Sequence, residues 1–222
     1  MRYGMSSLLD LLTGPRSALS PVPPAVSPLG IQIRAYRPAD KDACVEIYNE
    51  NEPGRFPDGV VGQFEQFLQY PGYLRLVGCI DEQPIAIGGI GLIPGLFADN
   101  VWLVFGMVRP ALHRRGIGTA MLLARLAALP RPAKPVRVSL SSVEASDGFF
   151  ERFGFVYQGQ MAVPSSTKRL DVKSAILDSA GWETCRTLIH GMGIEATCLP
   201  PVPTLNVRKS VQPRPVRDTT QR

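Results

Sequence analysis

The feature that most constrains this chain is a glycine-containing turn that joins a strongly apolar strand to an apolar helix. Residues 101–108 (VWLVFGMV) form a nearly continuous apolar run, which is typical of a strand buried on both faces. The turn HRRGIGTA occupies residues 113–120, and residues 116–128 then carry apolar side chains all round a helix. The strand and the helix are therefore expected to lie in the interior of one α/β domain.

The turn has the chemistry of an anion-binding site. Gly116 and Gly118 leave the backbone open to the close approach of a ligand. The first N–H groups of the following helix lack helical partners, and the positive end of the helix dipole favours negative charge. Arg114 and Arg115 add positive charge beside the turn. One helix terminus contributes only about 0.3–2 kcal/mol, so a phosphate site here requires several converging N–H donors.

From these residues alone, the turn could equally be a tight strand-to-helix connection that needs glycine and exposes two arginines. Other phosphate-binding motifs fit less well. The chain has no GxxxxGK[ST] sequence, and Met121 occupies the third glycine position of a dinucleotide-binding turn.

Apolar patterns predict the elements that precede the turn. Residues 31–36 alternate as a strand does, a helix follows with Asp40 as its N-cap, and a second helix covers residues 60–69. Residues 73–80 and 84–93 predict a β-hairpin.

Similar patterns predict the elements after the turn. A strand at residues 136–141 is followed by a short helix that ends at Phe153, where Gly154 suits a left-handed stop. A closing hairpin and a small helix with Trp182 complete the domain. The order is β-α-α-β-β-β-α-β-α-β-β, which predicts an α/β (α+β) fold with a mixed, mostly antiparallel sheet flanked by helices.

Composition indicates where this domain is expected to begin and end. Residues 1–30 are rich in Pro and Ser and are expected to form a disordered or weakly ordered leader, before a main domain at residues 31–178. An extra C-terminal helix is expected at residues 179–199 and a basic disordered tail at residues 200–222.

Composition also excludes several functions. No apolar run approaches the length of a membrane helix, so no membrane association is expected. Four cysteines without CxxC spacing, together with only two histidines, argue against a metal site and favour free thiols in a cytoplasmic protein. The net charge is +5, and the basic tail carries much of it without interleaved aromatic residues. Nucleic-acid binding is therefore not expected.

The stretch MVRPALHRRGIGTAMLLARLAAL resembles the coenzyme-binding region of the GNAT-type N-acetyltransferase superfamily, whose signature is Arg/Gln-x-x-Gly-x-Gly/Ala. The later stretch FFERFGF (residues 149–155) resembles a second motif of the same family. The resemblance covers about residues 31–177. It implies a GNAT-like sheet that splays between its fourth and fifth strands and binds acetyl-CoA there as the acyl donor.

The resemblance also implies roles for particular residues. Backbone groups of Met107 and Val108 would pair with the pantetheine arm, and a backbone N–H near Val108 would polarise the acyl carbonyl. Residues of the turn would hold the pyrophosphate through their backbone groups. These are His113, Arg114, Arg115, Gly116, Ile117, Gly118, Thr119 and Ala120.

The sequence departs from the family pattern at three places. His113 occupies the first Arg/Gln position, and Phe150 stands where the family often has a Tyr that protonates the leaving thiolate. Residues 101–108 also lack the Glu that some relatives carry as a base. A thiolate with a pKa of about 8.5 needs little help to leave at neutral pH. The catalytic residues are therefore unknown, with Glu144 as a weak candidate for a water-relayed base.

These features predict an N-acetyltransferase that transfers an acetyl group from acetyl-CoA directly to an amine of a small molecule or a protein. The alternative is a catalytically silent GNAT-like domain that binds coenzyme A as a sensor or scaffold. Neither the acceptor nor the acyl chain length is encoded in a motif, although residues 49–58 are expected to shape the acceptor pocket. The chain is expected to be a monomer or a homodimer.

Overall fold

The computed structural model describes residues 14–24, 30–52, 60–92, 100–146, 148–163 and 169–194. The strands are β1 (Gln32–Ala35), β2 (Tyr73–Ile80), β3 (Gln83–Leu92), β4 (Asn100–Val108), β5 (Val136–Ser142), β6 (Val156–Ala162) and β7 (Arg169–Leu177). The α-helices are α2 (Lys41–Asn51), α3 (Val61–Gln69), α4 (Ile117–Ala128) and α5 (Ser179–Gly191). Four short 3₁₀ segments join them: η1 (Pro38–Asp40), η2 (Pro110–Leu112), η3 (Glu144–Ser146) and η4 (Glu151–Phe153).

The seven strands form one mixed sheet in the order β1-β2-β3-β4-β5-β7-β6. Every neighbouring pair is antiparallel except β4 and β5, which run parallel. The predicted α/β class and the mostly antiparallel sheet are therefore confirmed. The short helix expected before Phe153 is a 3₁₀ segment, and Gly154 ends it with φ of 83° as predicted.

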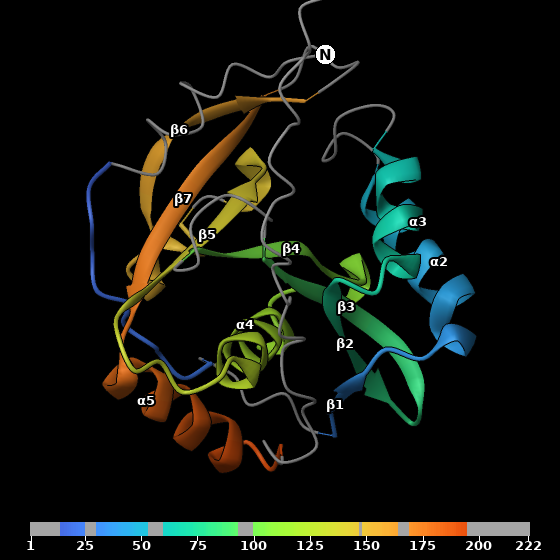
Figure 1. Ribbon diagram of the computed structural model, residues 1–222. Helices are drawn as coiled ribbons and strands as arrows, with labels where there is room; N and C mark the ends of the chain where they lie inside the picture. Colours follow the sequence, from blue (N-terminus) through green and yellow to red (C-terminus); the bar gives the residue numbers. More distant parts are fainter. Residues whose placement is uncertain are drawn as a thin grey trace, which may run out of the picture.

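Helices cover both faces of the sheet (Figure 1). Helices α4 and α5 pack on one face, which we call the α4 face, against apolar residues such as Leu76, Leu103 and Leu140. Helices α2 and α3 pack on the other face, the α2 face, against residues such as Val77 and Ile87. The alternation of side chains along each strand therefore supplies two separate apolar layers.

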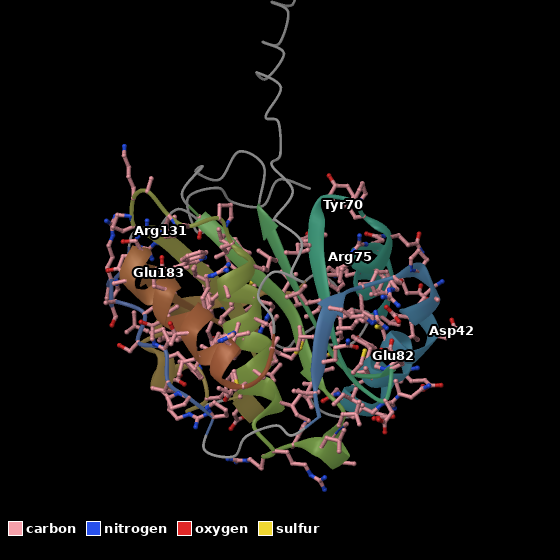
Figure 2. The ribbon with its side chains drawn as sticks, turned by 90° about the horizontal axis from the view of Figure 1, so that it is seen from below. Asp42, Tyr70, Arg75, Glu82, Arg131 and Glu183 are labelled. Atoms are coloured by element: carbon pink, nitrogen blue, oxygen red, sulfur yellow. The ribbon has the colours of Figure 1, made fainter. Side chains whose placement is uncertain are left out.

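Helix α5 is held against α4 at the outer side of the molecule. The indole Nε1 of Trp182 donates to the carbonyl of Leu129 at 2.8 Å, just beyond the end of α4. Arg131 and Glu183 lie close together (Figure 2) and form an exposed ion pair of 3.1 Å. Asp178 caps α5 through the N–H of Gly181.

Strands β4 and β5 separate within the sheet, as predicted. Their pairing runs from Asn100 and Arg137 to Leu103 and Leu140 and stops there, although β4 continues to Val108. Strand β4 remains paired with β3 over this stretch. The edge of β4 that faces β5 is therefore unpaired beyond Leu103, and we call this gap in the strand pairing the cleft.

A β-bulge in β4 coincides with the start of the cleft. Val104 pairs with Gly89 and Met107 with Ile87, so Phe105 and Gly106 together face a single residue of β3. Phe105 adopts φ of 47°, an unusual conformation for a bulky residue. The bulge directs Phe105 onto the aromatic cluster of the α2 face, where it packs edge-on against Phe64.

Part of the segment expected as a leader is ordered against the domain. The N–H of Leu19 donates to the carbonyl of Ile176 at 2.7 Å, and the N–H of Ser20 donates to the carbonyl of Phe153 at 2.8 Å. The side chain of Leu19 is buried in the core of the α4 face. Sequence patterning could not show this contact, because the segment pairs with a strand far along the chain.

Asp40 differs from its predicted role as an N-cap. Its carboxylate makes no capping bond to α2. It accepts instead from the N–H of Arg37 at 2.7 Å and from both terminal nitrogens of Arg34, at 2.8 and 2.9 Å. The guanidinium of Arg34 holds the pKa of this carboxyl below its usual range.

Several expectations lie outside the described residues. They concern residues 1–13 and 25–29 of the leader, residues 53–59 of the expected acceptor loop, residues 195–199 after α5, and the basic tail.

Candidate active site

The glycine-containing turn leads from η2 into α4, beside the open edge of β4. Gly116 is the N-cap of α4 with φ of 77°, and Arg114 also has a positive φ, of 63°. The first main-chain bond of the helix is donated by Ala120 N–H to the carbonyl of Gly116 at 3.0 Å. In the described part of the chain, the N–H groups of residues 114–119 donate to no backbone or capping acceptor. Six amides are thus available at the positive end of the helix.

Gly118 has room for a side chain in the described structure. A Cβ added there would meet only the ring of Phe149 at 3.7 Å, which is an ordinary contact. Its backbone is not in the left-handed region, unlike that of Gly116. A glycine in a helix costs up to about 1 kcal/mol relative to alanine. Packing among the described residues therefore does not require glycine at position 118, and its backbone is left uncovered by a side chain.

The positive charge around this turn has no acidic partner among the described residues. His113, Arg114 and Arg115 are all exposed. The ion pairs of the described residues include neither arginine. The turn thus combines free amides, a helix dipole and two uncompensated guanidinium groups, which is the composition of an anion site.

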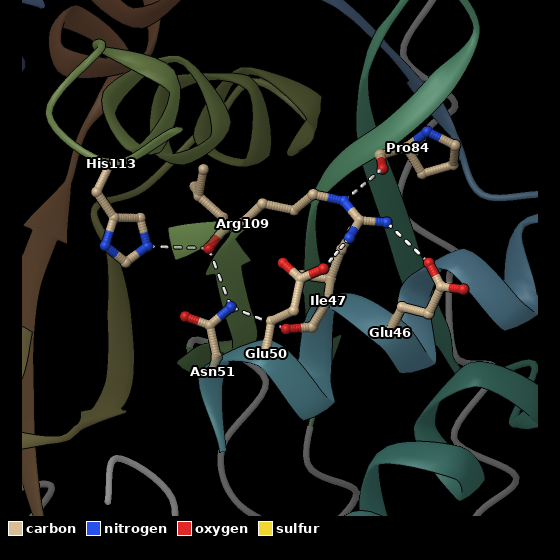
Figure 3. Close-up of polar contacts among 8 residues, drawn as sticks. Glu46, Ile47, Glu50, Asn51, Pro84, Arg109 and His113 are labelled. Carbon is tan, nitrogen blue, oxygen red and sulfur yellow. Dashed lines mark hydrogen bonds and ion pairs between the residues drawn. The ribbon is translucent and has the colours of Figure 1, made fainter. Parts of the chain in front are cut away.

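A polar cluster fixes the end of β4 next to the turn (Figure 3). The carbonyl of Val108 accepts from Asn51 Nδ2 at 3.0 Å and lies 2.9 Å from His113 Nε2. Asn51 is buried at the end of α2 and also donates to the carbonyl of Ile47. The imidazole at position 113 therefore closes the turn onto Val108, and Asn51 joins the turn to the α2 face.

Arg109 extends this cluster toward the surface. Its guanidinium contacts Glu50 and lies 3.0 Å from Glu46, both on α2, while its Nε donates to the carbonyl of Pro84 on β3 at 3.4 Å. One side chain thus connects α2, β3 and β4 (Figure 3). This brace holds the end of β4 beyond the point where β4 and β5 stop pairing.

The amide of Val108 faces the cleft. The next N–H, that of Arg109, donates to the carbonyl of Ile85 on β3 at 2.9 Å. Successive N–H groups of a strand point in opposite directions. The Val108 N–H therefore points toward the gap left by β5, where it can donate to a ligand carbonyl. Met107 directs its side chain to the α2 face, and by the same alternation its N–H points toward β3, where it pairs with Ile87.

The candidate catalytic side chains lie after β5. Glu144 is exposed in η3, the 3₁₀ segment just beyond the end of the strand. Phe150 is half-buried and packs edge-on against Phe149, with ring centroids 4.9 Å apart, and against Phe155. The phenyl ring offers no proton to a leaving group.

Sequence analysis missed Asn51, Arg109 and the bulge, because each depends on contacts between distant segments. It also missed Arg125, which lies on α4 and is only 4% exposed. A signal for Arg125 was available, since it is the one charged residue in a helix that is otherwise apolar on every side.

The sequence of residues 41–155 matches the acetyltransferase (GNAT) family. The match covers more than half of the chain, from α2 through the cleft to the end of the FFERFGF motif. The protein therefore belongs to the GNAT family of acetyltransferases and is an acyltransferase. No protein of curated function matches the full sequence significantly.

Three solved structures show the same fold. The ribosomal-protein-S18-alanine N-acetyltransferase of Escherichia coli is 17% identical, with a TM-score of 0.51 over 67% of this chain and 94% of that chain. A GNAT acetyltransferase of Staphylococcus aureus is 14% identical, with a TM-score of 0.52 over 67% and 99%. An acetyltransferase of Thermus thermophilus is 17% identical, with a TM-score of 0.50 over 68% and 100%.

The described residues contain no group of three His, Cys, Asp or Glu side chains that could hold a metal ion. Within the same ranges, no helix combines the length and the apolar character that crossing a bilayer requires.

Proposed function

We propose that this GNAT protein binds acetyl-CoA in the cleft between β4 and β5 and transfers the acetyl group directly to an amine. The observation that carries the proposal is the turn before α4. Six free amides, a helix dipole and the bare Cα of Gly118 meet beside the open edge of β4. A diphosphate presents several anionic oxygens to such donors at once. Residues 113–120 are accordingly assigned to the pyrophosphate.

The same geometry provides a path for the pantetheine arm. The arm would run from the turn along the unpaired edge of β4, beside Met107 and Val108, where β5 has diverged. The Val108 N–H then donates to a carbonyl of the arm. The thioester lies further along the strand, toward the bulge at Gly106, where a backbone N–H near Val108 stabilises the negative charge that develops on its oxygen during attack. The brace through Arg109 and Asn51 keeps this donor in place.

The acceptor amine approaches from the α2 face, opposite α4. Deprotonating a lysine amine at pH 7 costs about 4.6 kcal/mol, whereas an α-amino group costs about 1 kcal/mol. An exposed carboxylate acting through water, such as Glu144, or an acceptor of low pKa meets this requirement. We propose an amine of a small molecule or of a protein as acceptor.

A second function is a silent domain that binds coenzyme A without turnover. Phe150 in place of an acid, and the absence of a carboxylate within β4, favour it. A direct test uses the purified full chain with labelled acetyl-CoA and a panel of small amines, amino acids and peptides. Transfer to any amine above the non-enzymatic rate supports the enzyme, whereas tight coenzyme binding without transfer to any acceptor supports the silent domain.

We further propose that the protein works in the cytoplasm as a monomer or homodimer. The support is that Cys44, Cys79 and Cys185 are reduced and buried, as is usual in a reducing compartment.

A further inference from the structure

Arg125 is a buried cation that lies beside the cleft without an acidic partner. Within the described residues, its hydrogen bond is from Nε to the carbonyl of Met121 in its own helix, at 3.3 Å. No described carboxylate pairs with it. Burial lowers the pKa of the guanidinium to about 10, which still leaves it charged at neutral pH.

The sheet is shaped around this guanidinium. A Cβ added at Gly106 of β4 would lie 2.9 Å from Arg125 Nη2, and one added at Gly88 of β3 would lie 3.0 Å from its Cδ. Both distances are too short for any other residue type to be accommodated without movement. Two facing glycines at the bulge therefore form a slot for Arg125 on the α4 face.

This slot lies where the reactive end of the coenzyme would be placed. Gly106 is an exposed position of β4, two residues before Val108 and inside the stretch that β5 leaves unpaired. An arm that enters at Gly116 and passes Val108 reaches Gly106 next, about 7 Å further along the strand. The guanidinium is thus just beneath the part of the cleft that receives the sulfur.

An isolated charge at this depth is costly, because burial removes its hydration without a compensating partner. Replacement by an apolar side chain would relieve that cost. The unpaired guanidinium of Arg125 therefore suits an anionic ligand. An anion that is present only during the reaction would complete an ion pair with it.

We propose that Arg125 stabilises the coenzyme thiolate as it leaves the acyl carbon. The amine nitrogen forms a bond to the thioester carbon, the carbon–sulfur bond breaks, and its electron pair goes to sulfur. The amine loses its proton to water or to a base, and the thiolate takes up a proton from solvent after transfer. Arg125 keeps its own protons throughout and acts by charge and hydrogen bonding. The inference rests on the proposed function, and it explains how a GNAT site with Phe150 in place of an acid can still turn over.

The decisive experiment measures the pKa of the coenzyme thiol while it is bound to the full-length protein. The thiolate absorbs in the ultraviolet, so a pH titration of the complex reports it directly. In the wild type we expect the thiol to titrate near pH 7 or lower, because a cation within hydrogen-bonding reach lowers an acid's pKa by roughly 1–3 from about 8.5. In Arg125→Met we expect it to return to its ordinary value or above.

Kinetics provide the second readout. Arg125→Met should lower kcat with acetyl-CoA by about 10- to 100-fold and change the affinity for coenzyme A far less. Arg125→Lys, which keeps a charge but has a different shape, should recover part of the rate. Arg131→Met is the matched control, since it removes an exposed arginine that lies just beyond the C-terminal end of α4 and pairs with Glu183 (Figure 2). It should alter neither the thiol nor kcat.

The outcomes are separable. A wild-type complex whose bound thiol titrates at its ordinary value, or a lowered value that persists in Arg125→Met, overturns the role of Arg125 and leaves the proposed function intact. Failure of the wild-type protein to bind coenzyme A at all overturns the proposed function. If Arg125→Met does not fold, Arg125→Gln removes the charge in its place, and Arg125→Lys remains the variant that keeps it.

Discussion

At Gly118, stability and coenzyme binding should favour different residues. Replacing it with alanine should raise the free energy of unfolding by up to about 1 kcal/mol, because its Cβ has room. The same methyl group should weaken coenzyme A binding, since it occupies the approach to the free amides. Thermal unfolding and calorimetric titration test the two effects separately.

Gly62→Ala is the matched control for that variant. Gly62 is the second residue of α3, as Gly118 is of α4, and a Cβ there would meet no atom within 4 Å. It should stabilise the fold without changing coenzyme affinity. Equal coenzyme affinity in the wild type and Gly118→Ala would contradict the placement of the phosphates.

Asp40 governs a pH-dependent part of the stability. Its pKa is lowered by Arg34, so the pair stabilises the fold above the ordinary carboxyl pKa of about 3.9 and is lost as pH falls through the lowered value. Asp40→Asn should cost about 1–3 kcal/mol at neutral pH and almost nothing at strongly acidic pH. Urea unfolding of both proteins across this range measures the difference, and a gap that does not shrink in acid would refute the assignment.

Replacing Arg125 should make the folded protein more stable and the transfer reaction slower. Burial in the folded state lowers the pKa of the Arg125 guanidinium, which means that folding disfavours its charged form. Arg125→Met is therefore expected to raise the free energy of unfolding by about 1–4 kcal/mol while it slows transfer. Chemical denaturation without coenzyme tests this, and a clear loss of stability would show that the guanidinium has a structural partner.

Phe150 offers a test of the leaving-group chemistry. Phe150→Tyr places a proton donor at the position where relatives carry one, on a ring that is only half-buried. If Arg125 and this hydroxyl serve the same sulfur, the substitution should raise kcat more in the Arg125→Met background than in the wild type. Equal effects in both backgrounds would mean that the two side chains act independently.

At the scale of elements, the strands and helices around the cleft were predictable because each carries a strong local signal. The apolar run of β4 and the all-round apolar α4 required burial, and Gly116 and Gly154 marked their turns through a positive φ. The bulge at Phe105 was not predictable, because neither its φ nor its partner residue follows from neighbouring side chains. The roles of Asn51 and Arg109 depend on the packing of α2 against β4 for the same reason.

The composition of residues 1–30 did not indicate that part of this segment packs against the domain. Leu19 is 6% exposed and lies in the same core as α4 and α5. Leu19→Ala should cost about 2–5 kcal/mol, measured by chemical denaturation, whereas Val22→Ala, at a partly buried neighbour, should cost less. A loss below about 0.5 kcal/mol for Leu19→Ala would mean that this segment does not contribute to the fold.

At the scale of the whole molecule, the proposed reaction uses the two faces of the sheet in different ways. In the proposed reaction, the α4 face would supply the amides for the phosphates and the buried cation of Arg125, and the acceptor would approach from the α2 face. The parting of β4 from β5 connects the two sides (Figure 1). The sequence indicated the coenzyme-binding turn through its motifs, but it contains no comparable signal for the acceptor.

The most direct test of this account is calorimetric titration of the full-length protein with coenzyme A, compared with the Gly118→Glu variant. The account predicts saturable one-to-one binding by the wild type. It predicts a loss of affinity of at least about a hundredfold, or ~2.7 kcal/mol, in the variant, whose new carboxylate occupies the anion site of a folded domain. Absence of binding by the folded wild type at millimolar coenzyme, or equal affinity in the two proteins, would contradict it.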